Sequence, residues 1–145
     1  MELTDLEMQR YKKHLQLQEM GLENQLKLKQ AAVLVVGAGG LGSPVLLYLA
    51  AAGVGRITIV DGDVVTLSNL QRQVIHTTSR VGAMKVESAK VMLHEINPQV
   101  EVVAIPENLT VENAESLIRA HQLTVDCTDN METRLLINAS CVRQQ

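Results

Sequence analysis

Glycines and one acidic residue at fixed spacing offer the first sign of chemistry in this chain. Gly37, Gly39 and Gly42 form a G-x-G-x-x-G pattern, and Gly40 adds a fourth glycine. The first glycine of such a loop permits a tight turn, the second lets a phosphate approach the backbone, and the third lets a helix pack against a strand. Asp61 follows at the distance expected for an acid that holds ribose hydroxyls. The pattern therefore favours a nucleotide site over a structural glycine turn.

A second group of polar residues follows Asp61. Residues 63–75 lack the period of a helix or of a strand, which predicts a long loop with a helical turn. Long polar loops on a rigid scaffold often carry binding residues. The loop contributes a dense set of directional side chains: Ser68, Asn69, Gln71, Arg72 and Gln73.

Two more charged residues extend the candidate site. Lys85 falls on the apolar face of a predicted helix, near its positive N-terminal end, where an anion would offset both unfavourable features. The alternative is a lysine that extends to solvent. Asp129 could hold Mg²⁺, which prefers one or two carboxylates together with phosphate oxygens and water. Its alternative role is to cap the last helix, and both roles can coexist. Arg72 and Lys85 together suit a triphosphate, since arginine can clamp phosphate and lysine acts as a point charge.

No Ser-His-Asp or Cys-His set is evident, so the chemistry should rest on positioning and on charge stabilisation. The four histidines are interpreted as surface or packing residues: His14, His76, His94 and His121.

The elements that must position these residues alternate between strand and helix. Strands are predicted over 33–36, 56–60, 100–105 and 123–125, and helices over 43–52, 81–96, 110–121 and from 131 to the end. This order predicts a Rossmann-like three-layer α/β fold with a mainly parallel sheet in the order 3-2-1-4. The glycine loop, Asp61 and Asp129 all follow carboxyl ends of strands. They should therefore line one crevice at the topological switch point.

The helices carry more detailed expectations. Val81, Met84, Ala89, Met92 and Ile96 should form the apolar face of the helix over 81–96. In the last helix Leu135, Leu136, Ile137 and Ala139 should point inward. Near the N-terminus, a T-x-x-E capping box predicts one helix from residue 5 to residue 15, followed by a short helix over 22–29. We expect residues 1–30 to form a helical arm and residues 31–145 the nucleotide-binding domain.

Composition narrows the class of protein. The 145 residues carry a net charge of −3, are 46% hydrophobic, and contain two Tyr but no Phe or Trp. A nucleic-acid platform needs aromatic rings and excess basic residues, so nucleic acid is not an expected partner. The N-terminus lacks the apolar region of a signal peptide, and no apolar run is long enough to span a membrane. The two cysteines have neither C-x-x-C spacing nor a disulfide framework. These features are typical of a cytoplasmic protein.

Several blocks together resemble the MoeB/ThiF family, the bacterial branch of the ubiquitin-activating enzymes. They are GAGGLGS, VDGDVV, LSNLQRQ, KVESAK, INP and DCTDN, and the likeness runs from Arg10 to Cys141. The resemblance implies an ATP-dependent adenylyltransferase. In this reaction the C-terminal glycine carboxylate of a ubiquitin-like sulfur-carrier protein attacks the α-phosphate of ATP, pyrophosphate leaves, and an acyl-adenylate forms. The expected pathway is molybdopterin or thiamine synthesis.

The resemblance also assigns roles by position. It implies that Gly40 approaches the phosphates, that Asp61 holds the ribose, and that Asp129 holds Mg²⁺ with Asn130 beside it. It further implies that Arg72 and Lys85 stabilise charge as pyrophosphate departs. The remaining binding residues implied by the LSNLQRQ block are Ser68, Asn69, Leu70 and Gln71.

The chain departs from the family pattern in two ways. Lys13 stands where the family has an arginine that reaches into the partner protomer's active site, so a homodimer is implied but the planar fork of arginine is lost. Family members also continue beyond this length, with two C-x-x-C zinc pairs and a reactive cysteine. We therefore expect an ATP-binding half without zinc, in which Cys127 is a packed residue.

Three alternatives stay open at this stage. A hydride-transferring oxidoreductase would share the glycine loop and Asp61 but would leave Asn69, Arg72 and Lys85 without a role. A non-catalytic nucleotide-binding or dimerisation module is the second alternative. The third is a tRNA-modifying relative that activates a small carboxylate.

Overall fold

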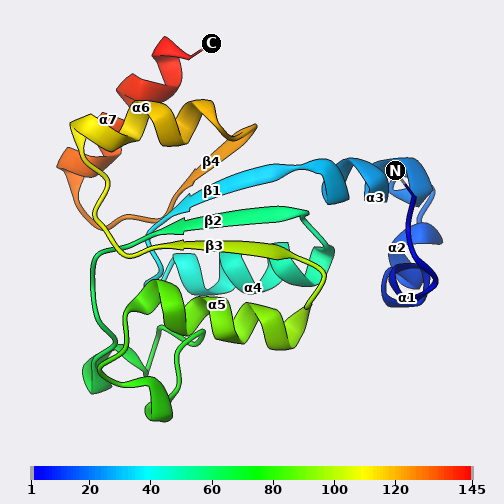
Figure 1. Ribbon diagram of the computed structural model, residues 1–145, viewed down its shortest axis with the longest axis horizontal. Coiled ribbons are helices and arrows are strands. Elements are labelled where there is room, and N and C mark those ends of the chain that lie inside the picture. Colours follow the sequence, from blue (N-terminus) through cyan, green and yellow to red (C-terminus); the bar gives the residue numbers. More distant parts are fainter. Residues whose placement is uncertain (1, 145) are drawn as a thin grey trace.

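The computed structural model describes residues 2–144 and contains a parallel sheet between two layers of helices (Figure 1). The strands are β1 (Ala32–Val36), β2 (Arg56–Val60), β3 (Glu101–Ile105) and β4 (Leu123–Asp126), in the order β3-β2-β1-β4. All three pairings are parallel, and Val35 lies opposite Ile59 on one side and Val125 on the other. The predicted α/β fold and strand order are confirmed.

Each face of the sheet has its own core because β1 is buried on both faces. Helices α4 (Gly42–Ala52) and α5 (Lys85–Ile96) cover one face, and α6 (Val111–Arg119) and α7 (Met131–Arg143) cover the other (Figure 1). The first core is centred on Val35, Leu46, Ile59 and Leu93. The second gathers Leu34, Val36, Ile118 and Ile137. This arrangement suits the unbroken aliphatic runs of the central strands.

Helix α5 begins four residues later than predicted. Residues 63–65 and 83–85 pair through an isolated antiparallel bridge between Val64 and Met84, which holds this stretch extended. Gly82 has a φ of +91°, a left-handed conformation that also prevents a helix there. The predicted apolar face is therefore partly wrong. Val81 is exposed, and Val86 and Leu93 are buried although they were not predicted. Ala89 is buried and Met84, Met92 and Ile96 pack against the same core, as predicted.

The inward face predicted for α7 is also partly wrong. Ile137 is buried and Leu136 packs against it, as predicted, but Leu135 is 61% exposed and Ala139 is exposed. Four of five consecutive positions cannot face one side of a helix with 3.6 residues per turn. The buried stripe continues instead to Ser140, one turn after Ile137.

Three short helices precede the sheet: α1 (Asp5–Arg10), α2 (Lys12–Leu15) and α3 (Gly21–Gln30). The predicted capping box is confirmed, since the Glu7 N–H donates to Thr4 Oγ1 and the Thr4 N–H donates to Glu7 Oε2. The predicted single helix over 5–15 is wrong, because the chain turns at Tyr11. The ring of Tyr11 is buried against Gly53, and its hydroxyl accepts a hydrogen bond from Asn97. These helices lie beyond the amino ends of the strands (Figure 1).

Two single-turn 3₁₀ helices, η1 (Leu67–Asn69) and η2 (Thr78–Arg80), interrupt the segment between β2 and α5. The predicted long loop with a helical turn is confirmed. Among residues 2–144, no helix has the length and apolar character needed to cross a membrane.

Candidate functional site

The carboxyl ends of the strands surround a cleft of about 890 Å³. Its walls come from the glycine loop, the end of β2, the loop before α6 and the loop before α7. The volume is within the range of small-molecule sites. The cleft brings together eight of the predicted site residues: Gly37, Gly39, Gly40, Asp61, Arg72, Lys85, Asp129 and Asn130.

The glycine loop forms a cradle of backbone N–H groups. Gly37 has a φ of +102°, and a Cβ there would lie 2.6 Å from the Cys127 carbonyl oxygen. A Cβ at Gly42 would overlap the Gly37 carbonyl group, so the first and third glycines of the motif are required by packing. The N–H groups of Gly39, Gly40 and Leu41 donate to no acceptor within residues 2–144. Together with the positive end of α4, they can bind an anion.

Asp61 is fixed at the end of β2 by the backbone. Its Oδ2 accepts the Ala38 N–H at 2.8 Å, and its Oδ1 accepts the Asp63 N–H at 2.8 Å. Each carboxylate oxygen has a further lone pair for a hydroxyl group. The carboxylate is therefore oriented toward the cleft and can accept hydrogen bonds from a ribose.

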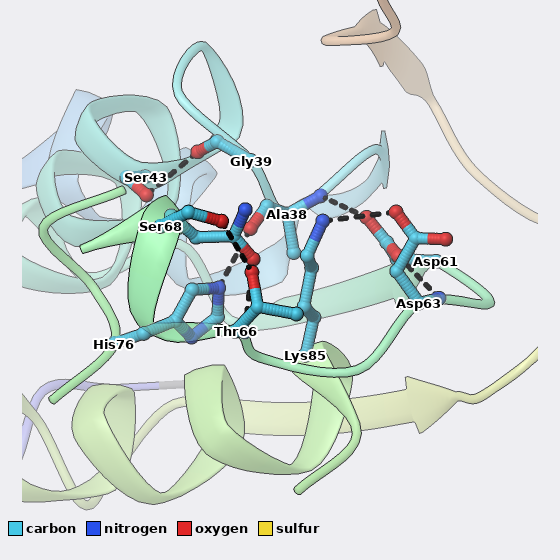
Figure 2. Close-up of polar contacts among 10 residues, drawn as sticks. Ala38, Gly39, Ser43, Asp61, Asp63, Thr66, Ser68, His76 and Lys85 are labelled. Carbon is cyan, nitrogen blue, oxygen red and sulfur yellow. Dashed lines mark hydrogen bonds and ion pairs between the residues drawn. The ribbon is translucent and has the colours of Figure 1, made fainter. Parts of the chain in front are cut away.

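Lys85 is the first residue of α5, and its side chain is only 8% exposed. Its Nζ lies 2.9 Å from Asp63 Oδ2, while its backbone N–H donates to the Asp63 carbonyl oxygen (Figure 2). The lysine does not extend to solvent. The anion beside it is Asp63, whose side chain is 69% exposed and lines the same cleft. Sequence reasoning missed Asp63, although the D-x-D spacing with Asp61 could have indicated it.

Arg72 lies beside the glycine loop. A Cβ at Gly40 would be 3.6 Å from Arg72 Cγ. Its Nη1 donates to the Ser68 carbonyl oxygen at 3.3 Å, and within residues 2–144 the guanidinium group has no carboxylate partner. It can therefore turn its remaining donors to an anion in the cleft.

Of the LSNLQRQ block only Arg72 and Gln73 line the cleft, and residues 67–71 lie outside its wall. Asn69 Oδ1 accepts the Thr66 N–H at 3.1 Å, and Ser68 Oγ lies 3.0 Å from Thr66 Oγ1, so both residues shape the 3₁₀ turn η1 (Figure 2). Gln71 donates weakly to the Ser68 carbonyl oxygen. The binding roles of Ser68, Asn69, Leu70 and Gln71 stay predictions.

The loop before α7 is held by its own hydrogen bonds. The Cys127 N–H donates to the Val36 carbonyl oxygen, and both the N–H and the hydroxyl group of Thr128 donate to Asp126 Oδ1. Asn130 caps α7, because its Oδ1 accepts the Thr133 N–H at 2.9 Å. The alternative capping role for Asp129 is therefore wrong.

The Asp129 carboxylate lines the cleft and has no hydrogen-bond or ion-pair partner within residues 2–144. No three His, Cys, Asp or Glu side chains gather as a metal site in that part of the chain. A single carboxylate beside a phosphate cradle nevertheless fits Mg²⁺, which takes few protein ligands when phosphate oxygens are present.

Several residues of the cleft were not predicted. Asn108, Thr110 and Glu112 come from the loop and helix start after β3, and Glu132 comes from the start of α7. The position of these segments after strand ends was the available signal. Gln73, in contrast, belongs to the polar set that the sequence indicated. It is 4% exposed, lines the cleft, and has no partner for its Oε1 within residues 2–144.

Charge in the cleft is dominated by carboxylates. The lining contains five acidic residues, namely Asp61, Asp63, Glu112, Asp129 and Glu132, and two basic ones, Arg72 and Lys85. A polyanion entering the cleft therefore needs further positive charge.

Two predicted residues need separate comment. Lys13 is exposed in α2, beyond the amino ends of the strands and away from the cleft (Figure 1). Cys127 is buried in the cleft wall. Burial, and next the nearby Asp126, raise the pKa of the Cys127 thiol, so it is not set up as a thiolate nucleophile.

The fold and the site define a nucleotide-binding α/β protein. The family model described as the ThiF family matches residues 11–145, and the chain belongs to this family.

Curated relatives carry the name adenylyltransferase and sulfurtransferase. Such a protein from Pyricularia oryzae, uba4, is 52% identical over 140 residues, covering 97% of this chain and 29% of the relative. The MOCS3 protein of Culex quinquefasciatus is 51% identical, with 97% and 32% covered. The chain thus spans about a third of the length of these relatives.

Solved structures give the same picture of the fold. The E. coli tRNA N6-threonylcarbamoyladenosine dehydratase TcdA in complex with ATP is 28% identical and has a TM-score of 0.92, with 99% of this chain and 58% of that chain covered. E. coli MccB with MccA-N7isoASN is 30% identical and has a TM-score of 0.84, with 94% and 41% covered.

Proposed function

We propose that this chain is the ATP-binding part of an adenylyltransferase that activates the C-terminal glycine carboxylate of a ubiquitin-like sulfur-carrier protein. A carboxylate oxygen attacks the α-phosphorus of ATP, the bond from that phosphorus to the bridging oxygen breaks, and pyrophosphate leaves. An acyl-adenylate results. The observation that carries the proposal is the combination, in one cleft, of unpaired loop N–H groups with Asp61, Arg72, Lys85 and Asp129.

Each of these groups has a chemical task in the proposed reaction. The N–H groups of Gly39 and Gly40 bind phosphate oxygens, and Asp61 accepts hydrogen bonds from the ribose. Arg72 and Lys85 are oriented before substrate arrives and stabilise the charge that develops on the departing pyrophosphate. No residue needs to form a covalent bond with substrate, so the site acts by positioning and by charge.

The acidic cleft supports a requirement for additional cations. Asp129 would hold Mg²⁺, which when bound neutralises charge on phosphate oxygens. A second copy of the chain could supply Lys13, so a homodimer is part of the proposal. Zinc is not part of it.

The relatives favour a protein carrier over the other substrate classes. Those named adenylyltransferase and sulfurtransferase are about half identical to this chain, whereas the tRNA-modifying TcdA is 28% identical. Synthesis of molybdopterin or thiamine is the proposed setting, in the cytoplasm. A tRNA-modifying role and a non-catalytic nucleotide-binding or dimerisation role are the alternatives that the experiment below must separate.

Calorimetric titration of the purified chain tests the nucleotide site. Mg·ATP should bind and NAD should not, and removal of Mg²⁺ with EDTA should weaken ATP binding. Arg72→Ala and Asp129→Ala should each lower the affinity about ten- to a hundredfold, the range expected when hydrogen bonds to charged groups are lost. Lys90→Ala, which removes an exposed cation outside the cleft, is the matched control.

Exchange of labelled pyrophosphate into ATP tests the reaction itself. Exchange that depends on a ubiquitin-like carrier with a C-terminal glycine supports the proposed function. Binding of Mg·ATP without exchange, in the presence of such a carrier, would favour the non-catalytic alternative. Preference for NAD over Mg·ATP would contradict the proposal.

A further inference from the structure

His76 is a buried histidine that the proposed reaction leaves without a role. It lies between η1 and η2, and its side chain is 4% exposed. Its Nε2 lies 2.8 Å from the carbonyl oxygen of Ala38 in the glycine loop, a contact drawn in Figure 2. Its Nδ1 lies 2.9 Å from Ser88 Oγ in α5. The ring therefore connects the glycine loop to α5.

The partners determine the tautomer of His76. A carbonyl oxygen only accepts hydrogen bonds, so Nε2 must carry the proton and donate to Ala38. Nδ1 then accepts from the hydroxyl group of Ser88. Burial lowers the pKa of His76 below its usual value. The Lys85 and Arg80 cations lower it further, while the Ala38 carbonyl and Asp61 oppose them. The neutral ring required by this geometry is thus also the form favoured by its surroundings.

The Ala38 carbonyl controls the direction of the next N–H group. Every peptide bond in residues 2–144 is trans, and in a trans peptide the C=O and the following N–H point in opposite directions. When His76 holds the Ala38 carbonyl, the Gly39 N–H is aimed away from His76. Gly39 lines the cleft, and its N–H has no acceptor within residues 2–144.

The contact is part of a closed ring of hydrogen bonds and one ion pair. In order, the ring runs through Lys85, Asp63, Asp61, Ala38, His76 and Ser88. Ser88 lies one turn after Lys85 in α5, which closes the ring through that helix. A shift of the glycine loop would therefore also disturb the residues that hold Lys85.

We infer that His76 is a positioning residue of the nucleotide site, which holds the Ala38 peptide so that the Gly39 N–H faces the phosphate groups of the nucleotide. The inference rests on the proposed function. It concerns the phosphates and neither the ribose nor the base. Loss of His76 should therefore weaken the binding of ATP and leave the binding of adenosine nearly unchanged.

The experiment compares His76→Ala and His76→Gln with the wild-type chain by calorimetric titration with Mg·ATP and with adenosine. His76→Ala should lower the affinity for Mg·ATP about tenfold, the effect expected for one misdirected hydrogen bond. His76→Gln should restore most of it, because a glutamine amide N–H can reach the place of Nε2. Urea unfolding of each variant measures stability separately.

His121→Ala is the matched control. His121 also bonds a carbonyl and a hydroxyl group, with Nδ1 at 2.6 Å from the Leu117 oxygen and Nε2 at 2.7 Å from Thr58 Oγ1. These partners lie in α6 and β2, outside the cleft lining. Its loss should cost stability without changing the affinity for Mg·ATP.

Three results would overturn the inference. In the first, His76→Ala binds Mg·ATP as the wild type does, which leaves the proposed function intact. In the second, His76→Ala and His121→Ala lower the affinities for Mg·ATP and adenosine alike, which marks a structural role. In the third, the folded wild-type chain does not bind Mg·ATP, and the proposed function falls as well. If His76→Ala does not fold, Ser88→Ala replaces it in the experiment. Ser88→Ala should lower the affinity for Mg·ATP severalfold, and an unchanged affinity would contradict the inference.

Discussion

At the scale of single residues, the cleft is built from groups that are oriented before any ligand arrives. Asp61 accepts two backbone N–H groups, and Lys85 is held in an ion pair with Asp63. A site whose dipoles and charges are already oriented needs little reorganisation during reaction. His76 also helps to orient the site before a ligand arrives, because its Nε2 bonds the Ala38 carbonyl oxygen in the glycine loop.

The neutral state of His76 makes a prediction about stability. Because the folded protein lowers its pKa, the unfolded chain binds more protons as the pH falls below about 6.5, the usual histidine pKa. The unfolding free energy should therefore rise with pH through this window and fall on acidification, by at most about 1.4 kcal/mol per pH unit for this one group. In His76→Gln this dependence should be weaker.

Urea unfolding of wild type and His76→Gln at several values between pH 5 and pH 7.5 measures the effect. The two proteins share every other ionisable group, so the difference between the two curves isolates His76. A difference that does not change with pH would contradict a buried neutral histidine.

Some of these residues could be predicted from sequence and others could not. The glycines, Asp61 and Asp129 follow strand ends, so parallel topology alone brings them together. His76 owes its role to a contact with Ala38 in the glycine loop, 38 positions away in sequence, which no local pattern encodes. The charge of Lys85 indicated a need for an anion, but the identity of that anion depended on the bridge between Val64 and Met84.

At the scale of elements, α4 is held at both ends. Its first turn carries the glycine loop, and its last carbonyl groups are bonded by side chains from elsewhere in the chain. Asn97 Nδ2 donates to the Ala50 carbonyl oxygen, and Gln25 Nε2 donates to the Ala52 carbonyl oxygen. Gly53 follows with a φ of +85° and ends the helix after Ala52, the last residue of the helix predicted over 43–52.

Asn97 joins three elements and should therefore matter for stability. It ends α5, donates to Ala50 of α4, and donates to the hydroxyl group of Tyr11 in the N-terminal helices. Asn97→Ala would leave a buried carbonyl and a buried hydroxyl group without this partner. We expect the unfolding free energy to fall by about 2–3 kcal/mol. Asn138→Ala, at an exposed position of α7, should change it by less than about 0.5 kcal/mol.

Urea unfolding at neutral pH measures both variants. Equal stability of Asn97→Ala and wild type would contradict a structural role for this contact.

The bounds of the strands and of α4 could be predicted from sequence, because aliphatic runs and helix-ending residues are local signals. The start of α5 could not, since the bridge to residues 63–65 competes with the helix.

At the scale of the whole molecule, the N-terminal helices lie beyond the amino ends of the strands (Figure 1), at the opposite end of the sheet from the residues that line the cleft. The cleft follows the carboxyl ends of the strands, whereas Tyr11 docks at Gly53 and Asn97, where α4 and α5 end. Lys13 follows Tyr11 by two positions and is exposed. If Lys13 acts in the proposed reaction, it must therefore act in the cleft of another copy of the chain.

This geometry predicts complementation between two variants. Lys13→Ala should slow adenylation more than it weakens ATP binding, because a cation from a second copy would stabilise departing charge rather than hold the ground state. Arg72→Ala should be inactive in its own cleft but can still donate Lys13. A mixture that exchanges subunits contains mixed dimers with one intact site, so about a quarter of wild-type activity should return in a two-fold dimer.

Pyrophosphate exchange in the presence of a ubiquitin-like carrier measures the activity of each variant and of the mixture. Lys12→Ala, at the neighbouring exposed lysine, should keep wild-type activity. A mixture no more active than its components, or an active Lys13→Ala chain, would show that each copy works with its own cleft alone.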